Sequence, residues 1–523
     1  MSNPIAPFYP IIYVRGYAMT EQEQNETTAD PFNGFNLGST VYRATSDKDK
    51  PAKKFIFESP LLRLVTDYKY MDVYKNGLDI MDIDDWEGTL PHRSIVIYRY
   101  YDIASTLLGT GKTPQITDFA KGLSQLIIRL RDLVCANQDN RITVDDFRCY
   151  LVAHSMGGLV CRAFLQNYEL GDDQARRCID KVFTYATPHN GIDIAGFNVP
   201  KWLSSSDINN FSRESMAKYL KLEPLYKKTG RVDWLSEESF PSDRFFCMVG
   251  TNRGDYEVAM GLSRTFSGHG SDGLVRIENA SIWGVNAKDQ VSTPCATAYA
   301  YRSHSGNFGI VNSEEAYQNL TRFLFGDIRV DIWVDVDSVQ LPPEIQGKPV
   351  NALYQFELKA SPRGMRWYLT RRKADEDSVA CRSYQELTDP SNKSSRSISL
   401  SSVFLSNKAR VDTENDPSLT YGLTMGVRTP DYEVVKKFWP DTHFEGGYLF
   451  QDTMIVKLTP PLQEEEKWII TFDWQSGNLG GASQTLVYKT LKSGKLQMAV
   501  PFGSKNAPGI AGKLRFVVSA WND

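Results

Sequence analysis

Ser155 stands in a stretch whose residue types and spacing suit a nucleophile. Residues 149–153 form an apolar run typical of a buried strand, and residues 156–164 have the apolar spacing of a helix. The serine therefore falls at a tight turn, where Gly157 and Gly158 let the helix start close behind the strand. A serine at such a turn projects its hydroxyl from the carboxyl edge of a sheet, in the strained arrangement called a nucleophile elbow. The chemistry expected of Ser155 is attack on a carbonyl carbon.

A nucleophilic serine needs a base, and the chain offers 6 histidines, at positions 92, 154, 189, 269, 304 and 443. His304 is the preferred base because it follows Asp272, which gives the chain order Ser155, Asp272, His304 of an α/β-hydrolase triad. Asp272 precedes a glycine on a predicted turn, where its carboxylate could orient the imidazole. Taken singly, Asp272 would more simply be an ordinary Asp-Gly turn and His304 a capped loop histidine, and the triad is preferred only when both are considered together with the elbow and Gly16. Glu278 is the alternative acid.

The other histidines have less direct interpretations. His154 adjoins the serine, and its side chain is expected to point away from the sheet edge. His189 follows a predicted strand end at Thr187-Pro188 and is expected to shape the wall of a substrate pocket. His443 falls in the C-terminal β region.

An early apolar run, residues 10–14, predicts a parallel strand that delivers a turn at Arg15-Gly16-Tyr17 to the same sheet edge. In serine hydrolases such a turn supplies one N–H of the oxyanion hole, and the residue after the nucleophile supplies the other. We therefore assign the hole to the backbone of Tyr17 and Met156. The competing interpretation is that Gly16 only turns a strand.

Further apolar segments complete a mostly parallel sheet with helices on both faces, the α/β-hydrolase fold, over residues 1–326. The expected strands and helices lie near 94–100, 119–133, 181–186, 245–250, 280–285 and 313–325. Two insertions interrupt them, at about 18–93 and 192–240. The second contains Trp202 and Phe211, which would line an acyl pocket if the segment is a helical cap. The alternative is a pair of surface helices.

Beyond Gly326 the apolar residues recur with period two and no convincing helix intervenes, which predicts a separate antiparallel domain over 327–523, most simply a β-sandwich. The expected strands lie near 328–336, 352–358, 365–371, 398–404, 448–457, 467–474, 485–489 and 514–521. All the candidate catalytic residues precede this domain.

Composition excludes several classes of function. The formal net charge of −4 over 523 residues, with both signs mixed throughout, predicts no nucleic-acid partner. No signal peptide or long apolar span is visible, so a cytoplasmic location or export without a classical signal is expected. The 7 cysteines are scattered singly, which favours buried thiols over disulfides or a metal cluster.

Two short motifs resemble ligand sites. Residues 79–87 are rich in aspartate but lack the glycine and oxygen spacing of an EF-hand loop, so a solvated acidic turn is preferred over a calcium site. Residues 109–113 imitate a P-loop, but Thr106 replaces its first glycine and Pro114 follows, so a helix start is preferred over an NTPase.

Residues 8–326 resemble the serine lipase and esterase branch of the α/β-hydrolases, including the group related to the GPI inositol deacylases. The resemblance lies in the motifs Ala153-His-Ser-Met-Gly-Gly, Thr187-Pro-His-Asn-Gly, Ser271-Asp-Gly-Leu-Val and Ser303-His-Ser-Gly. Departures are Ala153 and Arg15, where relatives carry glycine and histidine.

This resemblance implies hydrolysis of carboxylic esters through an acyl-enzyme, without a cofactor or a metal. The implied partner is an ester or lipid substrate, and peripheral contact with lipid is compatible with it. One alternative is a phospholipase-type secreted effector. Another, from a different class, is a catalytically inactive binding protein on a hydrolase fold.

Overall fold

The computed structural model divides the chain into two compact units, Met1–Thr297 with Tyr301–Phe325, and Ala298–Ala300 with Gly326–Asp523. It describes residues 5–16, 39–43, 53–57, 59–73, 79–84, 86–98, 100, 115–192, 211–253, 270–306, 309–409, 418–435, 442–459, 468–476 and 483–522.

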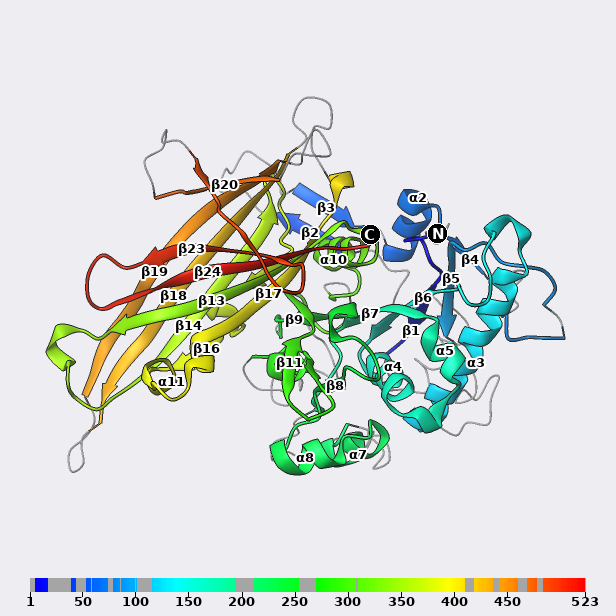
Figure 1. Cartoon of the computed structure of the whole chain (residues 1–523), viewed down its shortest axis with the longest axis horizontal. Helices are drawn as coiled ribbons and strands as arrows, with labels where there is room; N and C mark the ends of the chain where they lie inside the picture. The colour runs from blue at the N-terminus through cyan, green and yellow to red at the C-terminus, as the bar shows by residue number, and fades with distance from the viewer. Residues whose placement is uncertain are drawn as a thin grey trace. The chain divides into compact units, whose positions relative to one another are not determined.

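The first unit is built on a 7-stranded sheet, in which the neighbouring strands from β4 to β9 all pair in parallel (Figure 1). Its spatial order is β12 (Ala296–Ala300), β9 (Phe245–Gly250), β7 (Ile179–Tyr185), β6 (Cys149–His154), β1 (Ile11–Val14), β5 (Ser94–Tyr98) and β4 (Met71–Asp72). The central strands β1 and β6 are buried along almost their whole length, as expected of parallel strands covered on both faces.

Helices cover this sheet. The long crossover helix α3 (Ile116–Cys135) lies with α4 (Met156–Gln166) and α5 (Asp173–Arg177). Its apolar residues at helical spacing, which predict this helix, are all buried: Phe119, Leu123, Leu126, Ile127, Leu130 and Leu133. Helices α2 (Pro60–Tyr68) and α10 (Glu314–Phe325) lie together elsewhere on the unit, joined by an ion pair between Arg63 and Glu314 (Figure 1). Ser59 caps α2 through a side-chain bond to the N–H of Leu61 (3.2 Å). The predicted helix-covered parallel sheet is confirmed.

The segment 18–93 contains more regular structure than predicted. It includes the hairpin β2 (Ser39–Arg43) and β3 (Lys53–Phe57) besides α2. Its strand β4 pairs in parallel with β5 and so belongs to the main sheet. A two-residue strand leaves no periodic signal in the sequence, because alternation needs at least four residues to be seen.

The strand predicted at 280–285 belongs to another sheet. β10 (Trp283–Val285) lies between β8 (Trp234–Ser236) and β11 (Val291–Pro294) in a 3-stranded sheet. The edge strand of the main sheet is instead β12, whose sequence Ala-Thr-Ala-Tyr-Ala has weak strand propensity.

Short elements complete the first unit. They are α7 (Arg213–Tyr219), α8 (Glu223–Thr229) and the 3-10 turns Gln138–Asn140, Tyr168–Leu170, Ser242–Arg244 and Ile277–Asn279.

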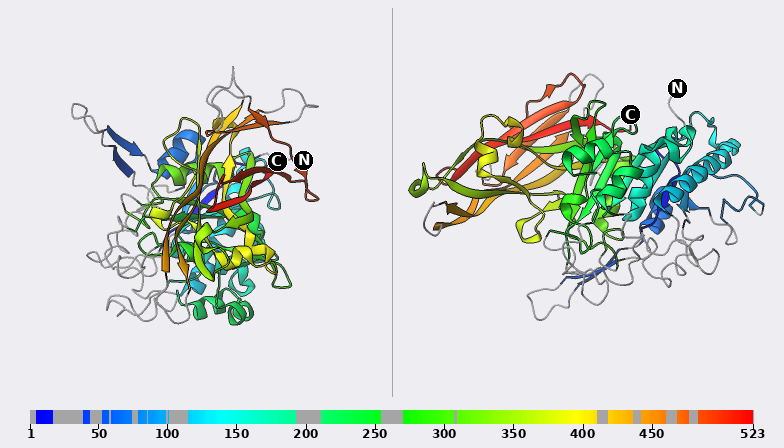
Figure 2. Two further views of the ribbon diagram at one scale, coloured as in Figure 1. Left: turned by 90° about the vertical axis from the view of Figure 1, so that its left-hand side faces the viewer. Right: turned by 90° about the horizontal axis from the view of Figure 1, so that it is seen from below.

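The second unit consists of two antiparallel sheets, as Figure 1 and Figure 2 show. The first sheet has the order β17 (Ser397–Leu405), β13 (Ile328–Gln340), β24 (Gly509–Ala520), β23 (Leu496–Gly503) and β22 (Lys489–Thr490). The second has the order β15 (Thr370–Arg372), β14 (Val350–Pro362), β18 (Leu419–Val434), β19 (Thr442–Thr459), β20 (Ile469–Trp474) and β21 (Gln484–Thr485), with β16 (Ala380–Ser383) also on β14.

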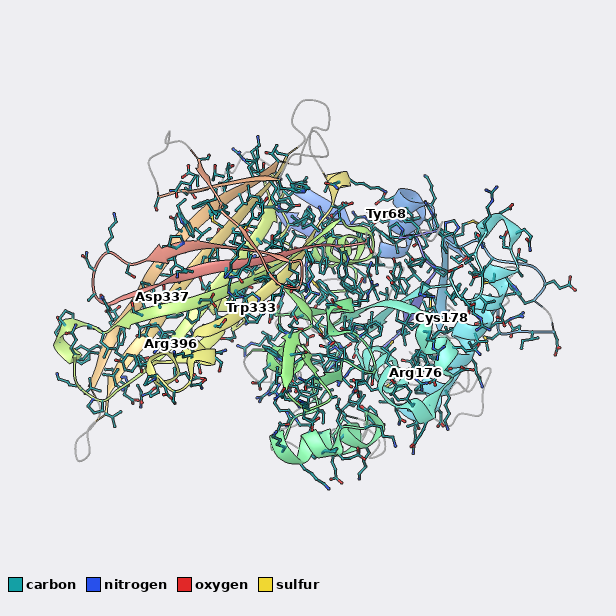
Figure 3. All side chains as sticks on the ribbon, in the orientation of Figure 1. Tyr68, Arg176, Cys178, Trp333, Asp337 and Arg396 are labelled. Carbon is teal, nitrogen blue, oxygen red and sulfur yellow. The ribbon has the colours of Figure 1, made fainter. Side chains whose placement is uncertain are left out.

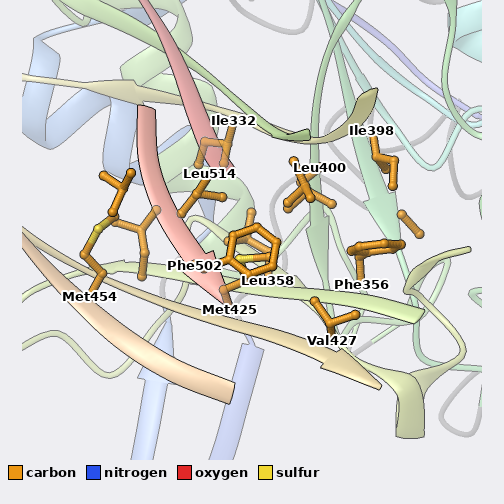
Figure 4. Packing of buried hydrophobic residues seen from close by; sticks show 14 of the residues in the cluster. Ile332, Phe356, Leu358, Ile398, Leu400, Met425, Val427, Met454, Phe502 and Leu514 are labelled. Carbon is orange, nitrogen blue, oxygen red and sulfur yellow. The ribbon is translucent and has the colours of Figure 1, made fainter. Parts of the chain in front are cut away.

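The inner faces of these sheets form one apolar core. Ile332 and Leu514 from the first sheet and Phe356, Met425 and Met454 from the second are all fully or almost fully buried in it (Figure 4). On the outer face of β13, Trp333 lies with the guanidinium of Arg515 5.0 Å from its ring centre (Figure 3). The β-sandwich expectation is confirmed.

The expectation that this unit has no helix is wrong. Helix α11 (Tyr384–Thr388) follows β16 and starts with a capping box in which Ser383 and Glu386 bond each other's backbone N–H. Short 3-10 turns also occur at Pro343–Ile345, Ala374–Glu376, Lys393–Arg396 and Asn407–Ala409. Among the helices that the structure describes in either unit, none is long and apolar enough to cross a membrane.

Candidate active site

Ser155 occupies the turn between β6 and α4. Its backbone has φ 51° and ψ −124°, an unusual conformation for a residue with a side chain. The Ser155 N–H donates to the carbonyl of Tyr185 on the neighbouring strand β7 (2.9 Å), which helps to hold this conformation. The strained turn predicted from the motif is therefore present.

The glycines after the serine are required by close approach. A Cβ on Gly157 would lie 2.2 Å from the carbonyl oxygen of Val14 on β1, and a Cβ on Gly158 would lie 2.2 Å from Oγ1 of Thr187. Helix α4 can thus start directly behind the sheet only with glycine at both positions.

The structure brings Ser155, His304 and Asp272 together. His304 Nε2 lies 2.9 Å from Ser155 Oγ, and His304 Nδ1 lies 3.0 Å from Asp272 Oδ2. All three residues are buried, with exposed fractions of 6%, 3% and 1% in that order. If Nδ1 carries the proton shared with Asp272, Nε2 is an acceptor for the serine hydroxyl.

The carboxylate of Asp272 is held on both oxygens. Its Oδ1 accepts from the N–H of Leu274 (3.0 Å) and of Val275 (2.8 Å), while Oδ2 faces His304. A Cβ on Gly250, at the end of β9, would lie 2.8 Å from Asp272 Cβ, so that strand end passes close to the acid. These contacts hold the carboxylate in one orientation.

Glu278 is placed differently from Asp272. Its side chain is 62% exposed and lies 3.7 Å from Arg276, in a weak surface ion pair. The carboxylate on His304 is that of Asp272.

The expected oxyanion turn follows β1, and the structure describes it as far as Gly16. The hydroxyl of Tyr100, itself buried, lies 2.5 Å from the Arg15 carbonyl and 3.0 Å from the Gly16 carbonyl. Sequence reasoning missed this tyrosine, which fixes the turn from the end of β5. Tyr17 lies outside the described residues.

Met156 supplies the first N–H of α4. The first N–H groups of a helix have no acceptor inside it, so they point toward whatever lies beyond its N-terminus. An anion forming at Ser155 would meet this end of the helix. Met156 remains the predicted second oxyanion donor.

The expectation that His154 points away from the sheet edge is wrong. Its Nε2 lies 2.9 Å from the backbone carbonyl of His304, and the two imidazole rings are 4.9 Å apart between centres. The alternation of side chains along a strand places His154 opposite to Ala153, but a contact with residue 304 depends on the loop after β12, which no local pattern describes.

His189 is fully buried beside the elbow helix. Its Nε2 lies 3.1 Å from Thr184 Oγ1 on β7, and its carbonyl accepts from Arg162 (2.8 Å). Burial and the charge of Arg162 hold the pKa of His189 well below its usual range, so its ring is neutral. A ring without exposed surface has a packing role in this structure rather than a place on an open pocket wall.

Arg162 on α4 is buried and bonds three backbone carbonyls, those of His189, Val232 and Trp234, each at 2.8 Å. Because the carbonyls satisfy its donors, the guanidinium can stay buried, although burial lowers its pKa to about 10. This residue joins the elbow helix to the loop that precedes the segment 192–240, at His189, and to residues near the end of that segment, at Val232 and Trp234. The sequence signal that could have pointed to Arg162 is an arginine among the apolar residues of this helix.

The described part of the expected cap lies at the far end of α4. Gln166 donates to the carbonyl of Leu220 (3.3 Å) and Asn167 to that of Tyr219 (3.2 Å), which attaches the end of α7 to the end of α4 remote from Ser155. These contacts suit the alternative of surface helices for this part. Phe211 is buried, and its carbonyl lies near Gly191. Trp202 lies outside the described residues.

Two aspartates of the acidic motif 79–87 make local hydrogen bonds. Asp79 and Asp82 accept backbone N–H bonds within their own turn, at 3.0 Å and 2.8 Å. Over the described ranges, no group of three or more His, Cys, Asp or Glu side chains could hold a metal ion. The P-loop-like segment 109–113 is outside those ranges.

All seven cysteines are described and free, and five of them are buried. Cys135 is half-buried and Cys381 is exposed, so the expectation of buried thiols holds for most of them.

No protein-family model matches the sequence, and no curated protein matches it. Among solved structures, the mature lipase BlEst2 of Bacillus licheniformis aligns with 59% of this chain and 90% of its own, at 14% identity and a TM-score of 0.27. The product of the gene lin2722 of Listeria innocua aligns with 60% of this chain and 93% of its own, at 12% identity and a TM-score of 0.25. Scores this low support no inference about shared chemistry. The strand order, the crossover helices and the elbow at Ser155 themselves show that the first unit has an α/β-hydrolase-like fold.

Proposed function

We propose that this protein is a serine hydrolase that cleaves carboxylic esters through an acyl-enzyme. The observation that carries the proposal is the hydrogen-bonded chain from Ser155 Oγ through the His304 ring to Asp272 Oδ2, with links of 2.9 Å and 3.0 Å. Both distances are within the range for catalytic proton transfer, and the serine sits in the strained elbow backbone.

The proposed reaction has two halves. Ser155 Oγ attacks the ester carbonyl while His304 Nε2 takes the hydroxyl proton, and Asp272 stabilises the imidazolium that forms. The tetrahedral oxyanion is held by the backbone N–H groups of Met156 and Tyr17. The C–O bond to the alcohol then breaks, the alcohol leaves with the proton from His304, and water releases the acid by the same steps in the second half.

The substrate we propose is an ester with an acyl chain longer than acetyl, including lipid esters. The support lies in the sequence of the segment 192–240 before α7, which contains Trp202 and Phe211. That sequence follows β7, whose end lies at the carboxyl edge of the sheet, where ligands of open α/β sheets bind.

A panel of p-nitrophenyl esters and phospholipids, assayed with the full chain, tests this function. Wild-type protein should hydrolyse at least one carboxylic ester with saturation kinetics, and Ser155→Ala should abolish that turnover while leaving Tm close to the wild-type value. Absence of turnover on every ester, in protein that unfolds cooperatively, would favour the inactive binding protein instead.

A further inference from the structure

His304 is held at its backbone as well as at its ring. Its N–H donates to the carbonyl of Asp272 (3.0 Å), and its own carbonyl lies 2.9 Å from Nε2 of His154. The two bonds fix the peptide groups on both sides of the His304 Cα. The position of that Cα determines how far the imidazole reaches toward Ser155.

The contact with His154 has only one chemical form. A carbonyl oxygen can only accept, so Nε2 of His154 must carry a proton and donate it. Burial, together with the neighbouring His304, lowers the pKa of His154 to about 3, so its ring is neutral at ordinary pH and Nδ1 bears a lone pair. His154 is therefore a fixed single donor toward the loop of the base.

The other side of the same ring faces the oxyanion turn. A Cβ built on Gly16 would lie 3.0 Å from Nδ1 of His154 and 2.9 Å from Ser155 Cβ, so the Gly16 backbone is in close contact with both residues. One imidazole thus lies between the loop that carries the base and the turn that precedes Tyr17.

We propose that His154 is a positioning residue. It holds the backbone of His304 in the place from which the His304 ring reaches Ser155 Oγ. The inference rests on the proposed serine-hydrolase function and adds a residue to its machinery. His154 takes no part in proton transfer, because its Nε2 is committed to a carbonyl. Its effect on the reaction passes through the placement of His304.

Two substitutions separate the hydrogen bond from the packing. His154→Leu keeps the volume but removes the donor, whereas His154→Gln keeps an N–H at comparable reach. A misplacement of about 1 Å in a catalytic group can reduce the rate about 100-fold. We expect His154→Leu to lower kcat by about 10-fold to 100-fold with KM close to wild type, and His154→Gln to restore most of that loss.

The matched control is His92→Leu. His92 is a half-buried imidazole whose Nδ1 lies 3.2 Å from Asn140 Oδ1. Its described hydrogen bonds are to Asn140 and not to Ser155, Asp272 or His304. This variant should leave kcat unchanged even if it lowers Tm. A second readout is the low-field NMR signal of the proton between His304 Nδ1 and Asp272, which should shift or broaden in His154→Leu and not in His92→Leu.

The outcomes are separable from those of the proposed function. If wild-type protein shows no ester turnover and no labelling by a fluorophosphonate, the proposed function fails. If wild-type protein is active but His154→Leu keeps its kcat and its low-field proton signal, the positioning role is overturned. Equal losses in His154→Leu and His154→Gln, with the NMR signal unchanged in both, would also overturn it, because the donor would not be the feature that matters.

Discussion

Asp272 binds His304 at two points, through its backbone carbonyl to the His304 N–H and through Oδ2 to the ring Nδ1, both at 3.0 Å. The side-chain bond sets the tautomer, whereas the backbone bond sets the distance between the two residues. Asp272 therefore positions the backbone of His304 as well as orienting its ring.

Asp272→Asn separates these contributions. The amide can still accept the N–H groups of Leu274 and Val275 through its oxygen, so Tm should fall by only a few degrees. Its NH₂ group would face Nδ1 and favour the wrong tautomer, so kcat should fall by roughly 10⁴-fold. Steady-state hydrolysis of a soluble ester and a thermal melt measure the two effects.

Glu278→Gln is the control for Asp272→Asn, since it neutralises the rival acid on the surface. It should leave kcat near wild type. If Glu278→Gln were the more damaging of the two, the assignment of the acid would be reversed. The double variant Asp272→Asn with Ser155→Ala should be no slower than Ser155→Ala alone, because triad residues act as a unit.

Gly157→Ala tests the close approach of α4 to the sheet. The added Cβ would lie 2.2 Å from the Val14 carbonyl, a clash that only a backbone shift can relieve. We expect a loss of stability of about 1–3 kcal/mol or more, and loss of activity with it because the elbow moves. The control is Gly447→Ala on β19, where a Cβ meets nothing within 4 Å and Tm should hardly change. Equal effects of the two substitutions on urea unfolding would contradict the packing described at the elbow.

Lys181 predicts a pH dependence of stability. This lysine on β7 is 1% exposed, and its Nζ donates to the carbonyl of Leu324 (3.0 Å) with Asp180 3.7 Å away. Burial lowers its pKa from 10.5 to about 7. Between these two values the unfolded chain binds the proton and the folded chain does not, so this group makes stability rise with pH across that window.

Lys181→Met should flatten this rise. The difference in the free energy of unfolding between wild type and variant should change by up to about 1.4 kcal/mol per pH unit between pH 7 and 10, and should be constant below pH 6. Urea unfolding at half-unit pH steps measures it. A difference that is constant over the whole range would show that Lys181 titrates near its ordinary value.

The acyl preference can be read from a chain-length series. Each buried CH₂ contributes about 0.8 kcal/mol, so four more carbons could raise kcat/KM by about two powers of ten before the pocket is filled. We expect the rise from acetate to a medium-chain ester to be flattened by Trp202→Ala or Phe211→Ala, with acetate hydrolysis little changed. Leu225→Ala, buried on α8 in the same segment, should lower stability without changing the profile. A profile that peaks at acetate in every variant would mean that this segment binds no acyl chain.

Much of the candidate site could be predicted because its signals are local. The strand, turn and helix around Ser155 occupy consecutive residues, and the need for glycine at 157 and 158 follows from the same motif. The choice of catalytic base was narrow because the chain has only 6 histidines, and His304 follows Asp272 in the chain order expected of the triad. The spacing of Ser383 and Glu386 is also a local signal, that of a capping box, although the short helix that it starts was not predicted.

The contacts that were missed depend on distant segments. His154 meets a carbonyl 150 residues later in the chain, and Tyr100 meets carbonyls 84 and 85 residues earlier. Strand β18, the longest missed element, contains Pro430, which normally argues against a strand. The partner strand accommodates it with Gly446, where a Cβ would lie 2.6 Å from the Pro430 carbonyl. Only the paired structure shows that compensation.

The most direct test of the central claim is intact-mass and peptide analysis after reaction with a fluorophosphonate. Wild-type protein should gain one phosphonyl group, carried by the peptide that contains Ser155, and Ser155→Ala should gain none while keeping its melting curve. The label should also form far more slowly in Asp272→Asn, because the nucleophile depends on the oriented base. A label on another residue, retained in Ser155→Ala, would contradict the assignment of the nucleophile and with it the proposed mechanism.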